Sequence, residues 1–172
     1  MRKFRIAALL LASCLLVGCQ SNLKYGVSSM KAEQYDKAIG YFQEEVEHGR
    51  NLGEAYRGIG IASYEKEAYQ EAVEAFEAAL ENEAKPTAAL YNLMANSYYH
   101  LENYEKALEY YAKVLEMEDC GAELAQSVKF NEIAIYQQLG DWKTVKEKVA
   151  SYVEAYPDDT RMDKTAEFLA TR

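Results

Sequence analysis

Small and aromatic residues return at matching positions in four stretches of the chain. In the first stretch, Tyr35 is followed three residues later by Ala38 and seven residues later by Phe42. The leading aromatic residue recurs as Tyr69, Tyr104 and Trp142. The spacings between these aromatics are 34, 35 and 38 residues. Residues three and seven apart share one face of an α-helix, and a period near 34 is typical of stacked helical hairpins. The pattern predicts three to four hairpins.

Each of the first three predicted hairpins also has a small residue in both of its helices. These residues are Gly26, Gly60 and Ala95 in the first helices and Ala38, Ala72 and Ala107 in the second helices. Together with the aromatic positions, they resemble the tetratricopeptide repeat family. The resemblance implies an all-α fold, a right-handed α-α superhelix (a tetratricopeptide solenoid) of antiparallel helices A and B. We expect this domain to span 22–157, with repeats at about 19–52, 53–86, 88–121 and 126–159.

The end of the chain departs from the regular repeat. Ile133 and Val145 stand where the fourth repeat should have small residues, so we expect its hairpin to be splayed or shifted. Pro157 should end the last helix B. The segment 159–172 then holds a helix, at about 159–170, that would cap the apolar end of the solenoid. A partner-binding tail is the alternative for this helix.

Glycine and short polar residues mark several helix boundaries. Gly49 and Gly140 suit left-handed helix ends, and Asn103 and Asp141 suit caps for the helices that follow. Cys120 lies in an acidic run, which should disfavour its thiolate, and we expect it to face solvent in a loop.

Composition excludes several function classes. Ala, Glu, Leu, Lys and Arg make up close to half of the residues, as in long helices, and two prolines and nine glycines are too few for an all-β fold. The formal net charge of −9 argues against nucleic-acid binding. We find no metal motif, nucleophile elbow or phosphate-binding loop. We therefore expect no catalytic residues, metal ligands or cofactor, and a protein that is not an enzyme.

The first residues have the features of an export signal. Arg2, Lys3 and Arg5 precede an apolar stretch over 6–17, which is too short to span a bilayer. The end of the stretch and the two residues after it read Leu16-Val17-Gly18-Cys19, which resembles the lipobox of bacterial lipoproteins. The resemblance implies that residues 1–18 are a cleaved signal peptide. It also implies lipid on the Cys19 sulfur, a short tether over 19–22, and a lipid-anchored, extracytoplasmic protein at the cell membrane. An ordinary cleaved signal peptide is the alternative.

Cleavage after residue 18 would remove three cations and no acids, so the charge would become −12. Such a chain should bind a partner with basic character, or a partner held by apolar anchors in a groove less acidic than the rest of the surface.

In the tetratricopeptide family, the A helices line a concave groove that binds peptides. Register carries the groove positions onto Arg57, Ile61, Tyr64, Asn92, Asn96, Tyr99, His100, Phe130 and Gln137, preceded in repeat one by Leu23, Val27, Met30 and Lys31. Asn92 and Asn96 would hold the backbone of a partner, or else hydrogen-bond within the repeat. Tyr64 and Tyr99 would contact a partner, or else pack between helices.

These features predict a membrane-anchored extracytoplasmic protein–protein interaction module. Its partner would be a peptide or protein of the cell envelope, and we expect neither a nucleic acid nor a small-molecule substrate. The alternative is a structural scaffold of an envelope or pilus-type complex that acts through self- or hetero-oligomerisation.

Overall fold

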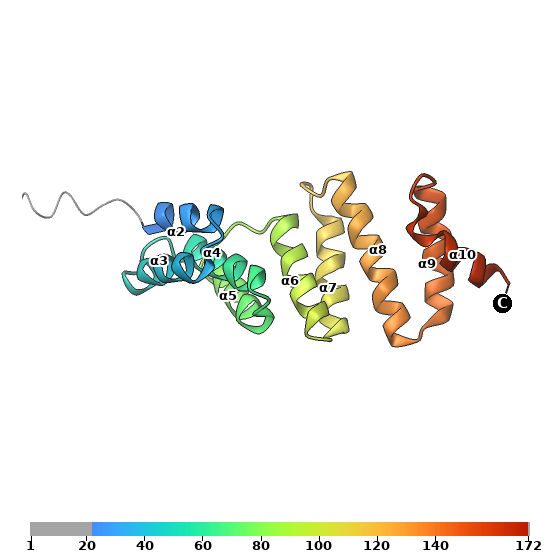
Figure 1. Ribbon diagram of the computed structural model, residues 1–172, viewed down its shortest axis with the longest axis horizontal. Helices are drawn as coiled ribbons and strands as arrows, with labels where there is room; N and C mark the ends of the chain where they lie inside the picture. Colours follow the sequence, from blue (N-terminus) through green and yellow to red (C-terminus); the bar gives the residue numbers. More distant parts are fainter. Residues whose placement is uncertain (1–21, 172) are drawn as a thin grey trace, which may run out of the picture.

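The computed structural model describes residues 22–171, so the predicted signal peptide and Cys19 lie outside the described residues. Every regular element in this part of the chain is helical. The elements are α2 (Asn22–Lys31), α3 (Tyr35–Glu47), α4 (Leu52–Glu65), α5 (Tyr69–Glu81), α6 (Ala88–His100), α7 (Tyr104–Glu116), α8 (Ala122–Leu139), α9 (Trp142–Ala155), the 3₁₀ turn η1 (Thr160–Met162) and α10 (Asp163–Ala170). Figure 1 shows them following one another along the long axis, with α2 and α10 at opposite ends.

Each helix packs mainly against its neighbours in the sequence. The helices form the hairpins α2–α3, α4–α5, α6–α7 and α8–α9, which are stacked in chain order (Figure 1). This arrangement confirms the all-α solenoid predicted from the repeat period, in which each unit shields the apolar face of the next.

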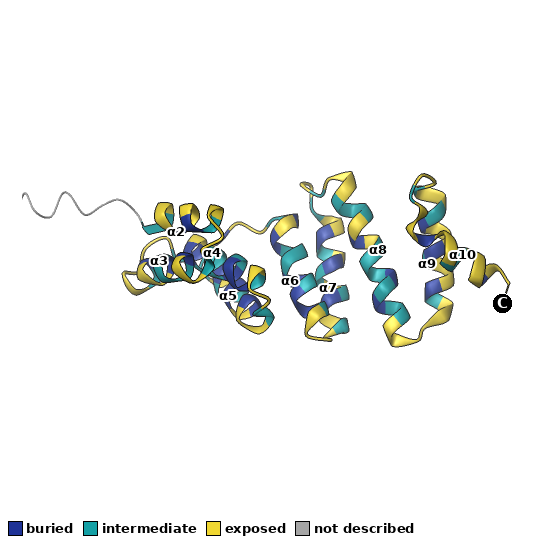
Figure 2. Cartoon of the chain, viewed as in Figure 1, coloured by how far each residue is buried: buried dark blue, intermediate teal, exposed yellow. Residues whose placement is uncertain are grey.

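The predicted small residues lie where helices approach closely. Ala38, Ala72, Ala95 and Ala107 have no exposed surface. A Cβ atom at Gly60 would lie 2.5 Å from the ring of Phe76, so only glycine fits there without a shift. Figure 2 shows the corresponding buried stripe on the inner faces of the helices, with exposed residues on the outer faces.

The aromatic residues of the second helices seal one hairpin against the next. Phe42 of α3 is buried between Gly26 of α2 and Gly58 of α4. Phe76 of α5 packs in one cluster with Leu90 and Met94 of α6. Residues at this position therefore contact the following repeat.

The structure confirms the predicted left-handed glycines and the predicted capping residues at the helix ends. Gly49 and Gly140 have φ angles of 64° and 70°, and the side chains of Asn103 and Asp141 accept backbone N–H groups at the starts of α7 and α9. The sequence did not reveal that glutamates occupy the left-handed position elsewhere. These are Glu33, Glu67, Glu83 and Glu102, with φ between 56° and 65°.

The fourth hairpin and the cap differ from the first three repeats. α8 and α9 approach each other less closely than α4 and α5 do, as the large residues Ile133 and Val145 predict. The predicted continuous helix at about 159–170 is wrong in one respect, because the 3₁₀ turn η1 precedes α10. The Asp159 side chain accepts a hydrogen bond from the Arg161 backbone N–H at this turn, so the cap segment begins as a tight 3₁₀ turn before α10.

The cap covers the last hairpin through apolar residues of η1 and α10. Met162 and Leu169 are buried against Val145 and Val149 of α9 in one cluster, and Ala166 packs against this cluster. Cys120 lies in the loop between α7 and α8, as predicted, but it is partly buried against the core cluster of α6 and α7 rather than facing solvent. This contact is favourable because a free cysteine behaves as a small hydrophobic residue.

Candidate partner-binding groove

A hollow of about 710 Å³ lies between α2 and α4, the first helices of the first two hairpins. Its lining residues are Leu23, Lys24, Val27, Ser28, Met30, Lys31, Phe42, Glu54, Arg57, Gly58 and Ile61. We call it the N-terminal hollow. Its volume lies within the range of roughly 300–1,000 Å³ that is usual for ligand sites.

Phe42 and two glycines shape this hollow. A Cβ atom at Gly58 would lie 2.6 Å from the Phe42 ring. Gly26 makes an equally close approach from α2. Because α2 and α4 each have a glycine beside the Phe42 ring, the ring fills the space between the two helices. The surface of the hollow over the ring stays concave.

The charge of the N-terminal hollow differs from that of the whole chain. Lys24, Lys31 and Arg57 line it together with one acid, Glu54, which forms an ion pair with Arg57. The chain as a whole carries a formal charge of −9. The hollow is therefore locally basic, which favours the predicted alternative of a groove less acidic than the rest of the surface.

The predicted groove residues of the first two repeats meet here. Arg57 and Ile61 line the hollow from α4, and the four predicted residues of repeat one line it from α2. The sequence analysis did not predict Lys24 and Glu54 as lining residues. Each lies one helical turn before a predicted groove residue, and this spacing is the one feature of the sequence that could have indicated them. Tyr64 lies further along α4, where its ring makes an edge contact with Tyr69 at 5.7 Å.

Asn96 is part of a hydrogen-bonded chain that joins three helices. The Tyr111 hydroxyl of α7 donates to Asn96 Oδ1 of α6 at 2.5 Å. Asn131 Nδ2 of α8 donates to the same hydroxyl at 3.1 Å. Tyr111 is 1% exposed, and burial raises its pKa to about 12. For Asn96 the structure therefore shows the hydrogen bond within the repeats, whereas Asn92 is partly exposed.

The other predicted residues of repeat three pack around the turns. The imidazole of His100 stacks on the Tyr69 ring, with centroids 4.2 Å apart and planes at 3°. Tyr99 contacts Tyr104 at a centroid distance of 6.0 Å. Both contacts join neighbouring helix ends, which is the alternative role that the sequence left open for Tyr99. They do not bring these residues into the N-terminal hollow.

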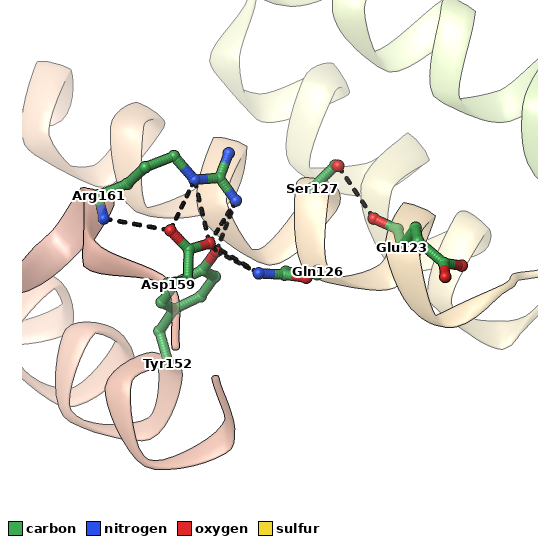
Figure 3. A network of polar contacts seen from close by, with 6 residues as sticks. All are labelled: Glu123, Gln126, Ser127, Tyr152, Asp159 and Arg161. Atoms are coloured by element: carbon green, nitrogen blue, oxygen red, sulfur yellow. Dashed lines mark hydrogen bonds and ion pairs between the residues drawn. The ribbon is translucent and has the colours of Figure 1, made fainter. Parts of the chain in front are cut away.

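Phe130 of α8 lies in the network that attaches the cap. The Arg161 guanidinium lies 4.3 Å from the centre of the Phe130 ring. Figure 3 shows Arg161 donating to the Asp159 carboxylate, which also accepts hydrogen bonds from Gln126 and from the Tyr152 hydroxyl. The Arg161 hydrogen bonds hold the pKa of Asp159 well below its usual range. Gln137, the last predicted groove residue, is partly exposed on α8.

Within residues 22–171, the His, Cys, Asp and Glu side chains form no group able to hold a metal ion. In the same part of the chain, no helix combines the length and the apolar character needed to cross a membrane.

Comparison with known proteins agrees with the fold. A tetratricopeptide repeat profile matches residues 26–89, and a second profile of the same repeat matches 88–119. Both matches end before α8. No curated protein was found to match the sequence.

Several solved structures share the arrangement of helices. YrrB, described as a TPR protein with an unusual peptide-binding site, superposes with a TM-score of 0.71 at 19% identity, over 87% of this chain and 75% of YrrB. MamA from AMB-1 superposes with a TM-score of 0.68 at 17% identity, over 86% of this chain and 78% of MamA. The C-terminal part of a TPR repeat-containing protein from Cytophaga hutchinsonii superposes with a TM-score of 0.52 at 13% identity, over 78% of this chain and 65% of that chain. At these identities the likeness shows the fold alone.

Proposed function

We propose that this member of the tetratricopeptide repeat family, to which residues 26–119 belong, is a membrane-anchored, extracytoplasmic interaction module. Its family supports the interaction role, and the resemblance of Leu16-Val17-Gly18-Cys19 to a lipobox supports the anchor. Its ligand is a peptide or protein segment of the cell envelope, bound in the N-terminal hollow. The observation that carries this proposal is the hollow itself, because it combines an apolar floor with basic side chains in an acidic chain.

The lining of the hollow indicates the chemistry of the ligand. Val27 and Ile61 offer apolar contact, and Val27 is 48% exposed. Lys24 and Lys31 supply positive charge next to this contact. Apolar side chains provide most of the affinity of an interface, whereas charges steer the encounter and select the partner. The ligand is therefore a segment with apolar anchors and acidic neighbours.

The proposed anchor would keep the hollow close to the bilayer. α2 begins at Asn22, three residues after Cys19. Three extended residues span about 10 Å. A partner that is itself at the membrane could reach α2 without a long linker, which supports an envelope protein as the ligand.

The anchor has its own test. Cys19→Ala should abolish metabolic labelling with a fatty acid, because the thiol that would carry the lipid is lost. Cys120→Ala is the matched control, because it removes a cysteine that lies between α7 and α8. Labelling that persists in Cys19→Ala, or that disappears in Cys120→Ala, would contradict the proposed attachment site.

The hollow is tested by placing a charge in it. Val27→Glu introduces a carboxylate at a half-exposed position, so it should weaken recovery of a crosslinked envelope partner without disturbing the core. Leu139→Glu is the matched control, because Leu139 is 53% exposed at the distant end of α8. Equal recovery with both variants would reject this binding site.

A further inference from the structure

Trp142 begins α9 at the position that Tyr35, Tyr69 and Tyr104 occupy in the first three hairpins. Those three tyrosines are partly buried, whereas the Trp142 side chain is 51% exposed. Its ring makes an edge contact with Phe168 of α10, with centroids 6.4 Å apart, and Phe168 is itself 44% exposed. The short cap thus leaves uncovered apolar surface at this end of the solenoid.

This surface is concave. A hollow of about 520 Å³ is lined by Trp142, Lys143, Lys146, Phe168 and Leu169, and we call it the C-terminal hollow. A second, smaller hollow of about 170 Å³ shares Lys146 and Leu169 with it and continues along the groove between α9 and α10. The two together offer a binding site for a side chain and the segment that carries it.

The charge of the C-terminal hollow is also opposite to that of the chain. Among the residues that the structure describes, Lys143 and Lys146 are the only charged ones that line it. Neither lysine takes part in the salt bridges found between residues 22 and 171. Two lysines beside exposed aromatic rings, with no carboxylate among the described lining residues, are complementary to a ligand that is apolar and acidic.

From this geometry we propose that the C-terminal hollow is a second docking site, which takes an acidic amphipathic segment of another protein. One large apolar side chain of that segment enters the hollow and packs against Trp142 and Phe168, and its carboxylates face Lys143 and Lys146. This proposal depends neither on the lipid anchor nor on the N-terminal hollow, since α2 and α10 lie at opposite ends of the molecule (Figure 1).

Two other occupants fit the surface less well. A second copy docked through the same patch would bring four lysines together without a carboxylate in either lining. An anionic bilayer is flat, so it would lie across the mouth of the hollow rather than fill it. A protein segment can instead place an apolar side chain in the hollow and its carboxylates beside the two lysines.

The protein carries its own reporter, because Trp142 is its single tryptophan. The full chain, with phosphatidylcholine nanodiscs present, is titrated with a synthetic amphipathic peptide of glutamate and leucine. Insertion should shift Trp142 emission to the blue and protect it from acrylamide quenching. A peptide with lysine in place of glutamate should give neither change, and binding at the N-terminal hollow does not report on this tryptophan.

Charge reversal assigns the interaction to the two lysines. Lys143→Glu/Lys146→Glu should weaken the apparent affinity on the order of tenfold, because attraction to the peptide becomes repulsion. Lys37→Glu/Lys85→Glu makes the same change in net charge at exposed positions on or beside other hairpins and should leave the affinity unchanged. Far-UV circular dichroism verifies that each variant keeps its helical content.

Four results would each overturn the proposal. The first is an unchanged emission at millimolar glutamate–leucine peptide, and the second is an equal response to the lysine–leucine peptide. The third is a shift caused by phosphatidylglycerol-containing nanodiscs without peptide, which would make a membrane the occupant. The fourth is a shift that follows protein concentration alone, which would make a second copy the occupant.

Discussion

The carboxylate of Glu45 accepts a hydrogen bond from the backbone N–H of Asn22 at 2.7 Å. Glu45 is fully buried in α3, and its carboxylate also accepts from the side chains of Arg50 and Asn51 at 3.3 and 3.1 Å. Asn22 is the first residue of α2, where N–H groups lack partners within the helix. A buried acid therefore holds the start of the helix that forms one wall of the N-terminal hollow.

We expect Glu45→Ala to lower the free energy of unfolding by about 2–3 kcal/mol, because it leaves the start of α2 and its polar neighbours without an acceptor. Urea denaturation measures this loss, and amide exchange should become faster in α2. Glu47→Ala, at an exposed position on the same helix, should change the stability by less than about 0.5 kcal/mol. Equal effects of the two substitutions would show that the Asn22 contact does not stabilise the fold.

The hydroxyl of Tyr111 joins α6, α7 and α8, so its removal should be costly. Tyr111→Phe keeps the ring but leaves Asn96 and Asn131 without their shared partner. We expect a loss of about 1–3 kcal/mol in the free energy of unfolding, measured by urea denaturation. Tyr136→Phe, at a partly buried position on α8, is the comparison and should cost less. A neutral Tyr111→Phe would mean that water replaces the hydroxyl at no cost.

The same residue predicts a pH dependence. Burial raises the pKa of the Tyr111 phenol from 10.0 to about 12, so the folded state holds its proton more strongly than the unfolded state. The associated stability is present below about pH 10 and is lost as the pH rises towards 12. Denaturation at a series of alkaline pH values should show this decline, and the slope should be smaller in Tyr111→Phe. An identical slope in both proteins would assign the decline to other groups.

The left-handed glutamates predict a gain in stability. Glu102 has φ of 57° in the turn between α6 and α7, where Gly140 has φ of 70° in the corresponding turn between α8 and α9. We expect Glu102→Gly to raise the free energy of unfolding by about 1 kcal/mol, because glycine adopts this conformation without steric cost. Gly140→Ala should lower it by a similar amount. Thermal or urea denaturation tests both, and destabilisation by Glu102→Gly would show that the glutamate contributes contacts that outweigh the strain.

Substitution of two glycines that both lie within helices should change the stability in opposite directions. Gly58→Ala should lower the free energy of unfolding by about 1–3 kcal/mol, because its Cβ would lie 2.6 Å from the Phe42 ring. Gly40→Ala should raise it by about 0.5–1 kcal/mol, because nothing lies within 4 Å of a Cβ atom there and alanine favours the helix. Urea denaturation measures both. A tolerated Gly58→Ala would show that Phe42 moves without cost.

The sequence was enough to predict the fold because its signals are local and periodic. Ala38, Ala72 and Ala107 recur at one position, and the structure buries all three. The tight turn before α10 was missed because it depends on Asp159 accepting the N–H of Arg161, a contact that no repeat pattern contains. The partial burial of Cys120 was missed for a similar reason, since the packing of a loop depends on tertiary contacts.

The candidate site was predicted only in part. Register assigned Arg57 and Ile61 to one face of their helix, and both line the N-terminal hollow, because helix periodicity fixes which side chains share a face. It could not show that Asn96 bonds to Tyr111, or that His100 stacks on Tyr69, because both partners come from other helices. The C-terminal hollow was also missed, since the exposure of Trp142 depends on how far the cap extends over α9.

The most direct measurement is site-specific photo-crosslinking from Val27 in the native membrane, with a crosslinker at Leu139 as the control. Binding in the N-terminal hollow predicts a defined adduct from Val27 and none from Leu139. It also predicts that Lys24→Glu/Lys31→Glu reduces the Val27 adduct severalfold, because the ligand carries acidic residues beside its apolar anchors. Equal adducts from Val27 and Leu139, or a Val27 adduct that the charge reversal leaves unchanged, would contradict the proposed binding site.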